Sequence, residues 1–349
     1  MKQEDESGKT FSNPPVPLTE QVLIPRLRNP WKFPLGGLIL LSTVILVLYL
    51  PITYRPSVQP RPARSYDEAV TRLSALQALD EDLALYPGCE SQFMTHGQKV
   101  ERVMVLLHGY RNCPAQFYQL GMIFYKQGYN VIIPRMPHHG LADMLSPDQA
   151  QLTADELSAH VTEAVDIAQG LGEQVTVSGM STGGVMAAWV AQNRTDIRQA
   201  VLIAPFFSPY AIPASLTTPA VNLFSILPNF FLWQDDKLKA EVPNPPQTYP
   251  QNSTRALSQI LQLSFAVRNQ ARRSAPAAAI LVVTNANDDA VDNQVTAGVV
   301  ADWRMHGFAS LQTYEFAADL RLDHDLLDPA HPKQKIELVY PVLTDLMLQ

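Results

Sequence analysis

Ser181 lies among glycines in the stretch V-S-G-M-S-T-G-G at 177–184, directly after the apolar run 174–177. Gly179 and Gly183 stand two residues to either side of the serine and relieve the crowding of a tight turn between a strand and a helix. On such a turn the serine hydroxyl is held out, and the first amides of the helix face its oxygen. The pattern is short enough to arise by chance in an ordinary turn. Its meaning therefore depends on residues elsewhere in the chain.

A carboxylate and a histidine that could activate this serine follow two later runs of strand type. Asp288 and Asp289 come after the apolar run 279–284, and His324 comes after the run 310–316. A serine hydroxyl is a poor nucleophile until an imidazole takes its proton and a carboxylate fixes the imidazole tautomer. Because ligands bind at the carboxyl ends of strands in open parallel sheets, the chain order Ser, Asp, His places all three at one edge.

A loop that could stabilise negative charge follows the run 100–107. The residues His108-Gly109-Tyr110 stand there, and such a loop can present a backbone N–H to a developing oxyanion. The amide of Thr182, next to the serine, would supply a second N–H. Losing one such donor typically costs about 3 kcal/mol in the transition state.

Other histidines are weaker rivals for the role of base. His306 lies late in a predicted helix, where a positive charge merely complements the helix dipole. His331 lies beyond the last predicted strand, and His324 could itself be a surface residue between two aspartates. The neighbouring pair His138-His139 has no carboxylate or cysteine at metal-ligand spacing. We expect neither a metal nor a cofactor.

The elements that must position these residues alternate between strands and helices. Such alternation predicts an α/β fold, with a mostly parallel sheet and helices on both faces. The predicted strands are 100–107, 129–134, 174–177, 200–203, 279–284 and 310–316; the predicted helices are 65 to about 87, 114–127, 152–170, 183–193, 293–306 and one from about 333.

Residues 206–275 interrupt the alternation with a long stretch that is rich in proline and aromatic residues. An excursion of this length within a compact domain is usually functional. We expect a helical cap over the site, although a decoration with its own small core would show the same composition.

The segment 33–54 is apolar and predicts a membrane anchor. It lacks charges from 33 to 52, and Trp31 and Tyr54 stand at its ends, where aromatic rings favour the headgroup region. A cleaved signal peptide and a buried core helix are the alternatives. The expected organisation is a tail at 1–32, the single transmembrane helix at 33–54, a proline-rich linker at 55–64 and one α/β domain at 65–349. Positive charges flank the span almost equally, so they do not indicate its orientation. We expect the domain to lie outside the cytoplasm because a single N-terminal anchor followed by a large domain usually has that orientation.

The amino-acid composition limits the kinds of molecule that the protein could bind. The 349 residues carry a formal net charge of -7 and include 46% hydrophobic residues, which argues against a nucleic-acid partner and allows a large core. The two cysteines, Cys89 and Cys113, could be buried thiols or, outside the cytoplasm, a disulfide. The sequence does not indicate an oligomeric state.

The motifs together resemble the α/β-hydrolase family, over about residues 88–348. The similarity is to its lipase and esterase branch, which includes monoacylglycerol-lipase-like, carboxylesterase-like and serine-aminopeptidase-like members. It rests on G-M-S-T-G, L-L-H-G-Y, R-M-P-H-H-G, N-A-N-D-D-A-V and D-H-D. The resemblance implies Ser181 as nucleophile, His324 as base, and the backbone N–H groups of Tyr110 and Thr182 as oxyanion donors.

The sequence departs from the family's pattern at two positions. In the acid motif G-x-x-D-x-x-V, Asn285 replaces the glycine, while Asp288 and Val291 match, which favours Asp288 over Asp289 as the acid. In the loop similar to the family's G-H-G, His138 replaces the first glycine.

The leading hypothesis is a membrane-anchored serine hydrolase that cleaves carboxylic esters through an acyl-enzyme. The apolar cap favours a lipid or other small ester as substrate, because ligand pockets are mostly lined by apolar residues. A peptidase or an acyltransferase would use the same triad. A non-catalytic, membrane-tethered binding module is disfavoured because every triad position is filled.

Overall fold

The computed structural model describes residues 35–240 and 246–348. The chain divides into two compact units, Met1–Ile45 and Leu46–Gln349. The described part of the first unit belongs to helix α1 (Leu35–Leu48), in which the side chains of 36–47 are exposed. Across the described ranges, no helix combines the length and apolar character that a membrane span requires.

Helix α1 is shorter than the predicted span. It has 14 residues and ends at Leu48, whereas the prediction ran to residue 54. Pro51 accounts for the early end, because proline lacks the N–H of a helix interior and disfavours helical geometry in the residue before it. Residues 33–34 and the predicted tail at 1–32 lie outside the described residues.

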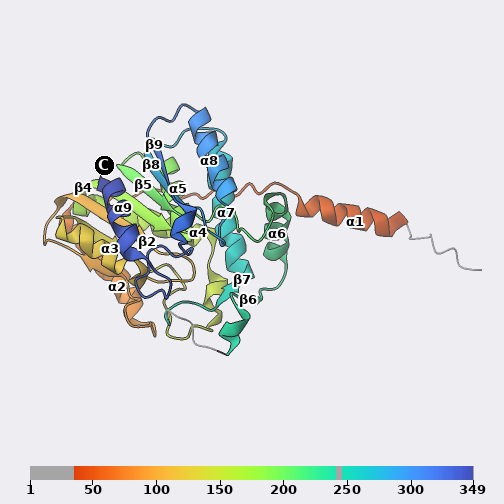
Figure 1. Ribbon diagram of the computed structural model, residues 1–349, viewed down its shortest axis with the longest axis horizontal. Coiled ribbons are helices and arrows are strands. Elements are labelled where there is room, and N and C mark those ends of the chain that lie inside the picture. Colours follow the sequence, from red (N-terminus) through yellow and green to blue (C-terminus); the bar gives the residue numbers. More distant parts are fainter. Residues whose placement is uncertain (1–34, 241–245, 349) are drawn as a thin grey trace, which may run out of the picture. The chain divides into compact units, whose positions relative to one another are not determined.

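The second unit is built on a seven-stranded sheet in the order β1-β3-β2-β4-β5-β8-β9. Figure 1 labels β2, β4, β5, β8 and β9 of this sheet. Every neighbouring pair is parallel except β1 with β3, which is antiparallel. Its strands are β1 (Gln92–Met94), β2 (Val100–Leu107), β3 (Asn130–Ile133), β4 (Gly172–Met180), β5 (Gln199–Ile203), β8 (Ala279–Asn285) and β9 (Leu311–Phe316). The prediction of a mostly parallel sheet is confirmed.

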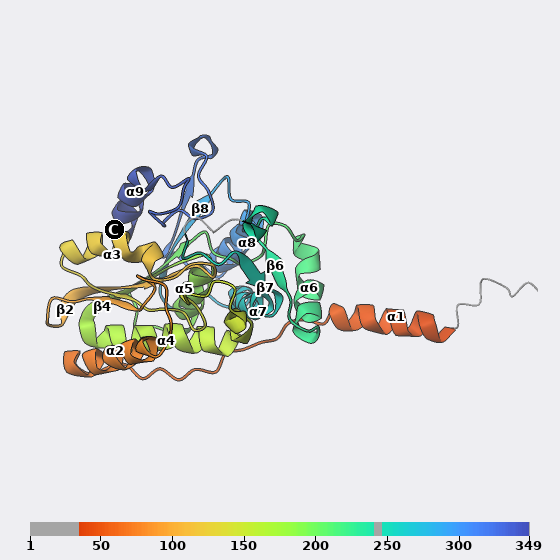
Figure 2. The ribbon, with the colours of Figure 1, turned by 90° about the horizontal axis from the view of Figure 1, so that it is seen from below.

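Alternate strand residues supply two cores, one on each face of the sheet. Val103 and Val105 of β2 join one cluster, and Met104 and Leu106 join the other. Each face is therefore apolar, as a sheet covered on both sides requires. The first cluster packs against α2 (Tyr66–Glu81), α4 (Ala154–Leu171), α5 (Thr182–Asn193), α7 (Thr254–Ala271) and α8 (Asn293–Met305); the second packs against α3 (Ala115–Lys126) and α9 (Ile336–Leu348) (Figure 2).

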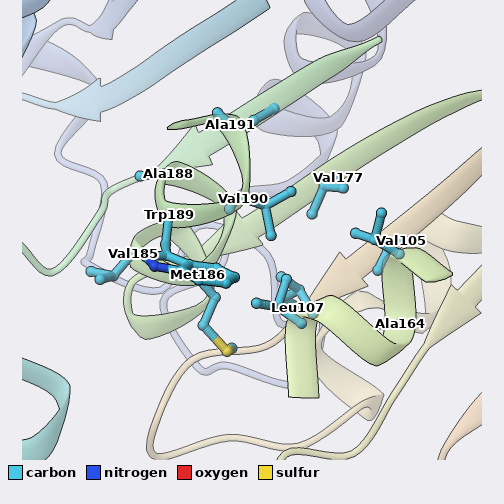
Figure 3. Close-up of a cluster of buried hydrophobic side chains, with 14 of the residues drawn as sticks. Val105, Leu107, Ala164, Val177, Val185, Met186, Ala188, Trp189, Val190 and Ala191 are labelled. Atoms are coloured by element: carbon cyan, nitrogen blue, oxygen red, sulfur yellow. The ribbon is translucent and has the colours of Figure 1, made fainter. Parts of the chain in front are cut away.

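Helix α5 is buried more completely than a surface helix. Figure 3 shows its side chains Met186 and Trp189 among Leu107 of β2 and Val177 of β4. Every residue of α5 except Asn193 is buried. The start of this helix is therefore fixed by its packing against the strands.

The predicted elements outside 206–275 match the structure closely, with three main differences. Helix α2 ends at Glu81, whereas the prediction ran to about residue 87. Strand β4 is longer than the predicted 174–177, because it begins at Gly172 and continues to Met180. Strand β1 was not predicted, since its three residues are too few to show a period. The remaining short elements are the 3-10 turns η1 (Pro147–Gln151), η2 (Asp236–Lys239) and η3 (Ala318–Leu320).

The segment 206–275 contains α6 (Ala214–Ile226), the antiparallel pair β6 (Phe231–Trp233) and β7 (Gln251–Ser253), and α7. Helix α7 belongs to the main core, where Ile260, Leu263 and Val267 are buried. Val221 of α6 instead joins a smaller cluster of four buried residues. The insertion is thus one helix in the main layer with a smaller substructure beside it.

Residues 48–63, from the last residue of α1 onward, run along the rest of the second unit, and 51–63 form neither helix nor strand. The side-chain amide of Asn222 in α6 donates to the carbonyls of Leu48 and Leu50, and Asn269 in α7 donates to that of Ile52. Farther along, Ala63 N donates to the carbonyl of Asp166 at 2.8 Å. The proline-rich stretch therefore follows the surface of the domain closely.

Candidate active site

Ser181 forms the turn between β4 and α5 in a strained conformation. Its φ of 55° and ψ of -112° lie in a region that non-glycine residues rarely adopt. Two backbone hydrogen bonds hold it in this conformation. Ser181 N donates to the carbonyl of Ile203, and Phe206 N donates to the carbonyl of Ser181. Ser181 remains partly exposed, whereas Met180 and Thr182 beside it are buried.

The two flanking glycines allow backbone contacts that a side chain would prevent. A Cβ on Gly179 would lie 2.1 Å from the carbonyl oxygen of Gly183, and a Cβ on Gly183 would lie 2.0 Å from that of Leu107. Both distances are far shorter than any real carbon–oxygen contact. The turn therefore requires glycine at both positions.

Asp288 and His324 meet beyond the carboxyl ends of β8 and β9. Nδ1 of His324 lies 2.8 Å from Oδ2 of Asp288, whose side chain is buried. The other oxygen, Oδ1, accepts from the backbone N–H groups of Ala290 and Val291. A carboxylate can only accept, so Nδ1 carries the proton and Nε2 is the nitrogen that can take another. Asp289, the alternative acid, is exposed.

The negative charges around His324 favour its protonated form. Burial alone would lower the pKa of its imidazole, but Asp288, and beyond it Asp325 and Asp323, outweigh this effect and raise the pKa above its ordinary value. A fifth of the side chain is still exposed. The imidazole is therefore a stronger base than a free histidine.

The loop at 108–110 lies directly against Ser181. A Cβ on Gly109 would stand 3.6 Å from the Cβ of Ser181. His108 is buried and holds the loop, since its Nε2 accepts from Met136 N while Nδ1 lies 2.9 Å from the carbonyl of Gly109. Burial keeps the pKa of His108 well below its usual range, so its ring is neutral.

Both expected oxyanion donors lie on segments that border this turn. Tyr110 follows Gly109, and its buried hydroxyl accepts from the backbone N–H of Ser253 in the insertion. Thr182 opens α5, where the first N–H groups have no partner within the helix. The loop, the serine and the pair Asp288–His324 thus share one edge of the sheet, at the ends of β2, β4, β8 and β9.

The remaining sequence candidates lie in other environments. His306 is exposed at the end of α8, and His331 donates its backbone N–H to the carbonyl of Asp328. His138 pairs with Glu156 at 3.2 Å and has a φ of 63°, a conformation that suits the glycine usual at this position in the family. Within 35–240 and 246–348, no cluster of three or more His, Cys, Asp or Glu side chains could hold a metal ion.

Cys89 and Cys113 form a disulfide with a Cα separation of 5.1 Å. This decides between the two alternatives that the sequence left open. The bond ties residue 89 to Cys113, which lies two residues before α3 and four residues after Gly109.

Sequence reasoning missed a buried polar network beside the site. Gln116 and Asn112 both donate to Asp325, the residue after His324. The second aspartate of D-H-D was the one available signal, because an acidic residue next to a buried histidine needs donors of its own.

A family model described as "Serine aminopeptidase, S33" matches residues 98–317. The match covers well over half of the chain, so the protein belongs to this family of α/β hydrolases, and the resemblance drawn from its motifs is confirmed.

The thermostable monoacylglycerol lipase of Bacillus sp. strain H-257 is 28% identical over 114 residues, which are 33% of this chain and 44% of that protein. The chain therefore matches less than half the length of this relative.

Solved structures share the fold at low identity. A structure from a study of LipS and LipT, two metagenome-derived lipolytic enzymes, has a TM-score of 0.59 at 17% identity over 76% of this chain and 99% of that one. The monoacylglycerol lipase of Paleococcus ferrophilus has a TM-score of 0.57 at 16% identity, over 76% and 98% of the two chains. A soluble variant of the Saccharomyces cerevisiae monoglyceride lipase has a TM-score of 0.55 at 15% identity, over 74% and 89%.

Proposed function

We propose that the protein is a serine hydrolase that cleaves carboxylic esters through an acyl-enzyme. The observation that carries the proposal is the 2.8 Å contact between Asp288 and His324 at the sheet edge where Ser181 sits on its strained turn. This is the arrangement that activates a serine hydroxyl: an imidazole base with one nitrogen held by a carboxylate.

In the first half-reaction, Oγ of Ser181 attacks the ester carbonyl carbon and its proton passes to Nε2 of His324. Asp288 stabilises the imidazolium, and the backbone N–H groups of Tyr110 and Thr182 hold the oxyanion. The C–O bond to the alcohol then breaks, and the alcohol leaves with the proton from His324. Water repeats these steps on the acyl-enzyme, releasing the carboxylic acid and the free serine.

An apolar acyl chain is the substrate group that the insertion favours. Residues 206–234 contain no Asp, Glu, Lys or Arg, so a charged group bound there would find no counter-ion among them. The relative from Bacillus is named a monoacylglycerol lipase, which agrees with a lipid ester. We therefore place the substrate among esters of apolar acids.

A membrane-bound location is part of the proposal. Large apolar side chains of the insertion are exposed, and Asn222 of the same substructure holds the carbonyls of Leu48 and Leu50 at the end of the apolar N-terminal segment. The exposed residues include Leu216, Leu223, Ile226, Leu227, Phe230 and Leu232. Such a surface suits contact with lipid. The disulfide favours a domain outside the cytoplasm, where cysteines oxidise.

Amide hydrolysis is the second candidate, because the family is described as serine aminopeptidases. An aminopeptidase binds a charged α-amino group, which a carboxylate near the site would have to pair. The absence of any acidic residue in 206–234 favours the ester over the peptide.

A substrate panel tests the proposal. The full-length protein in detergent should hydrolyse p-nitrophenyl esters and prefer medium over acetyl chains, with little activity on aminoacyl p-nitroanilides. Ser181→Ala should abolish this activity. Ser178→Ala is the matched control, because the buried hydroxyl of Ser178 has no hydrogen-bond partner and should be dispensable. Equal ester hydrolysis by Ser181→Ala would refute the mechanism, and faster anilide cleavage would favour the peptidase.

A further inference from the structure

Gln116 is a buried side chain whose two polar ends both bind groups next to the proposed catalytic residues. It lies in the first turn of α3 and is 2% exposed. Its Oε1 accepts from Gly109 N at 2.9 Å, and its Nε2 donates to Oδ2 of Asp325 at 2.9 Å. One amide therefore spans the gap between the loop before α3 and the loop after β9.

The two loops that it joins are the ones that must be aligned for catalysis. Gly109 lies against Ser181 and precedes Tyr110, the proposed oxyanion donor. Asp325 directly follows His324, the proposed base. A shift of either loop would move its catalytic group relative to the serine, and a displacement of about 1 Å can cost on the order of 10²-fold in rate.

Asp325, which accepts from the Gln116 side chain, is itself held in place by several other hydrogen bonds. Asn112 donates to Asp325 and Asp328 through Nδ2, and Gln247 of the insertion donates to Asp328. The other carboxylate oxygen of Asp325 accepts from the backbone N–H groups of residues 327 and 328. Asp325 thus presents one oxygen in a fixed position to Gln116.

The side-chain amide of Gln116 can link Gly109 and Asp325 in only one orientation. If the amide of Gln116 were flipped, its NH₂ would face the N–H of Gly109 and its oxygen would face the carboxylate of Asp325. Both contacts would be repulsive. A glutamate could still accept from Gly109, but it would place two carboxylates at hydrogen-bond distance.

We propose that Gln116 is a positioning residue. Its single side-chain amide holds the Gly109-Tyr110 loop and the His324 loop in fixed positions relative to Ser181. This inference rests on the proposed function. It assigns Gln116 no contact with substrate.

Replacement by an apolar side chain of similar size tests the bridge. Gln116→Met should lower kcat for p-nitrophenyl butyrate on the order of 10²-fold, with little change in KM. Gln192→Met is the matched control, because Gln192 is a buried glutamine on α5 that donates to the carbonyl of Val267 and touches neither loop. Its kcat should stay within about twofold of the wild type, as for a change outside the reacting unit.

Gln116→Glu should make the ratio of variant to wild-type kcat depend on pH, which a purely structural role of Gln116 would not do. Protonated, the carboxyl donates to Asp325 and accepts from Gly109 as the amide does; ionised, it repels Asp325. The ratio of variant to wild-type kcat should therefore fall as the pH rises. The other ionisable groups that act on Asp325 or its partners are His324, Asp328, Arg111 and Tyr340. Both proteins contain them, so the ratio reports the added ionisation of residue 116 together with the shift that its charge causes in the pKa of His324.

The outcomes separate this inference from the proposed function. If wild type reacts at Ser181 and Gln116→Met keeps its kcat, Gln116 does not position the loops and the proposed function stands. If wild type does not react at Ser181, the proposed function itself fails. Should Gln116→Met not fold, a variant to wild-type ratio for Gln116→Glu that stays flat with pH overturns the inference.

Discussion

His324 and Asp288 are 36 positions apart in the chain, yet Nδ1 of the imidazole lies 2.8 Å from a carboxylate oxygen. The contact arises because β8 and β9 are adjacent parallel strands, which deliver the residues after them to the same edge of the sheet. It fixes the tautomer in which Nε2 is free to accept a proton, and the first two predictions depend on it.

Asp288→Asn should lower kcat on the order of 10⁴-fold with little loss of stability, because an amide no longer selects the catalytic tautomer of His324. Asp289→Asn is the matched control and should retain activity, since Asp289 is exposed and lacks this contact. Ester hydrolysis and thermal melting of both variants check the prediction. An Asp288→Asn variant that keeps the activity of the wild type would show that Asp288 is not the acid.

The value of kcat/KM should decrease at acid pH, with a single inflection. His324 must be neutral to take a proton, and the surrounding aspartates raise its pKa, so activity should fall as the pH drops through a value above the ordinary pKa of histidine. Asp288→Asn removes the leading charge and should move the inflection of its residual activity to lower pH. An inflection that stays in place would assign the ionisation to another group.

Gly183→Ala should destabilise the protein by at least about 2 kcal/mol and abolish activity, because the added Cβ would overlap the carbonyl oxygen of Leu107. Gly298→Ala in α8 is the control, since no atom outside its chain neighbours and the nearby backbone of its own helix lies within 4 Å of its Cβ position. It should stabilise the helix by up to about 1 kcal/mol. Denaturant unfolding measures both, and a stable, active Gly183→Ala would contradict the close contact at the turn.

Breaking the disulfide should cost about 3 kcal/mol of stability, from the lost constraint on the 24-residue loop between Cys89 and Cys113. The double replacement by serine avoids leaving a lone thiol. Its unfolding free energy should be lower than that of the wild type under oxidising conditions, and reductant should lower the wild type to the same value. If reductant leaves the wild type unchanged, the bond does not stabilise the fold.

The sequence revealed the parts of the site that local patterns encode. Ser181 was visible because the turn needs glycines two residues away on each side, and Asp288 and His324 were visible because each follows a buried strand. The sheet itself followed from alternating apolar runs, apart from β1, which is too short to show a period.

Gln116 could not be found in this way. Its partners Gly109 and Asp325 are 7 and 209 positions away, and nothing in the composition of α3 indicates that its amide would span two loops. The course of residues 48–63 was hidden for the same reason, because Asn222 holds Leu48 across 174 positions. Contacts between distant segments depend on packing, which a single sequence does not display.

Covalent labelling tests the central claim most directly. Full-length protein treated with a fluorophosphonate should gain one adduct, which peptide mass spectrometry places on Ser181. The label should be absent from Ser181→Ala and present in Ser178→Ala, and its appearance should match the loss of ester hydrolysis. Folded protein that hydrolyses esters while Ser181 stays unlabelled would contradict the account.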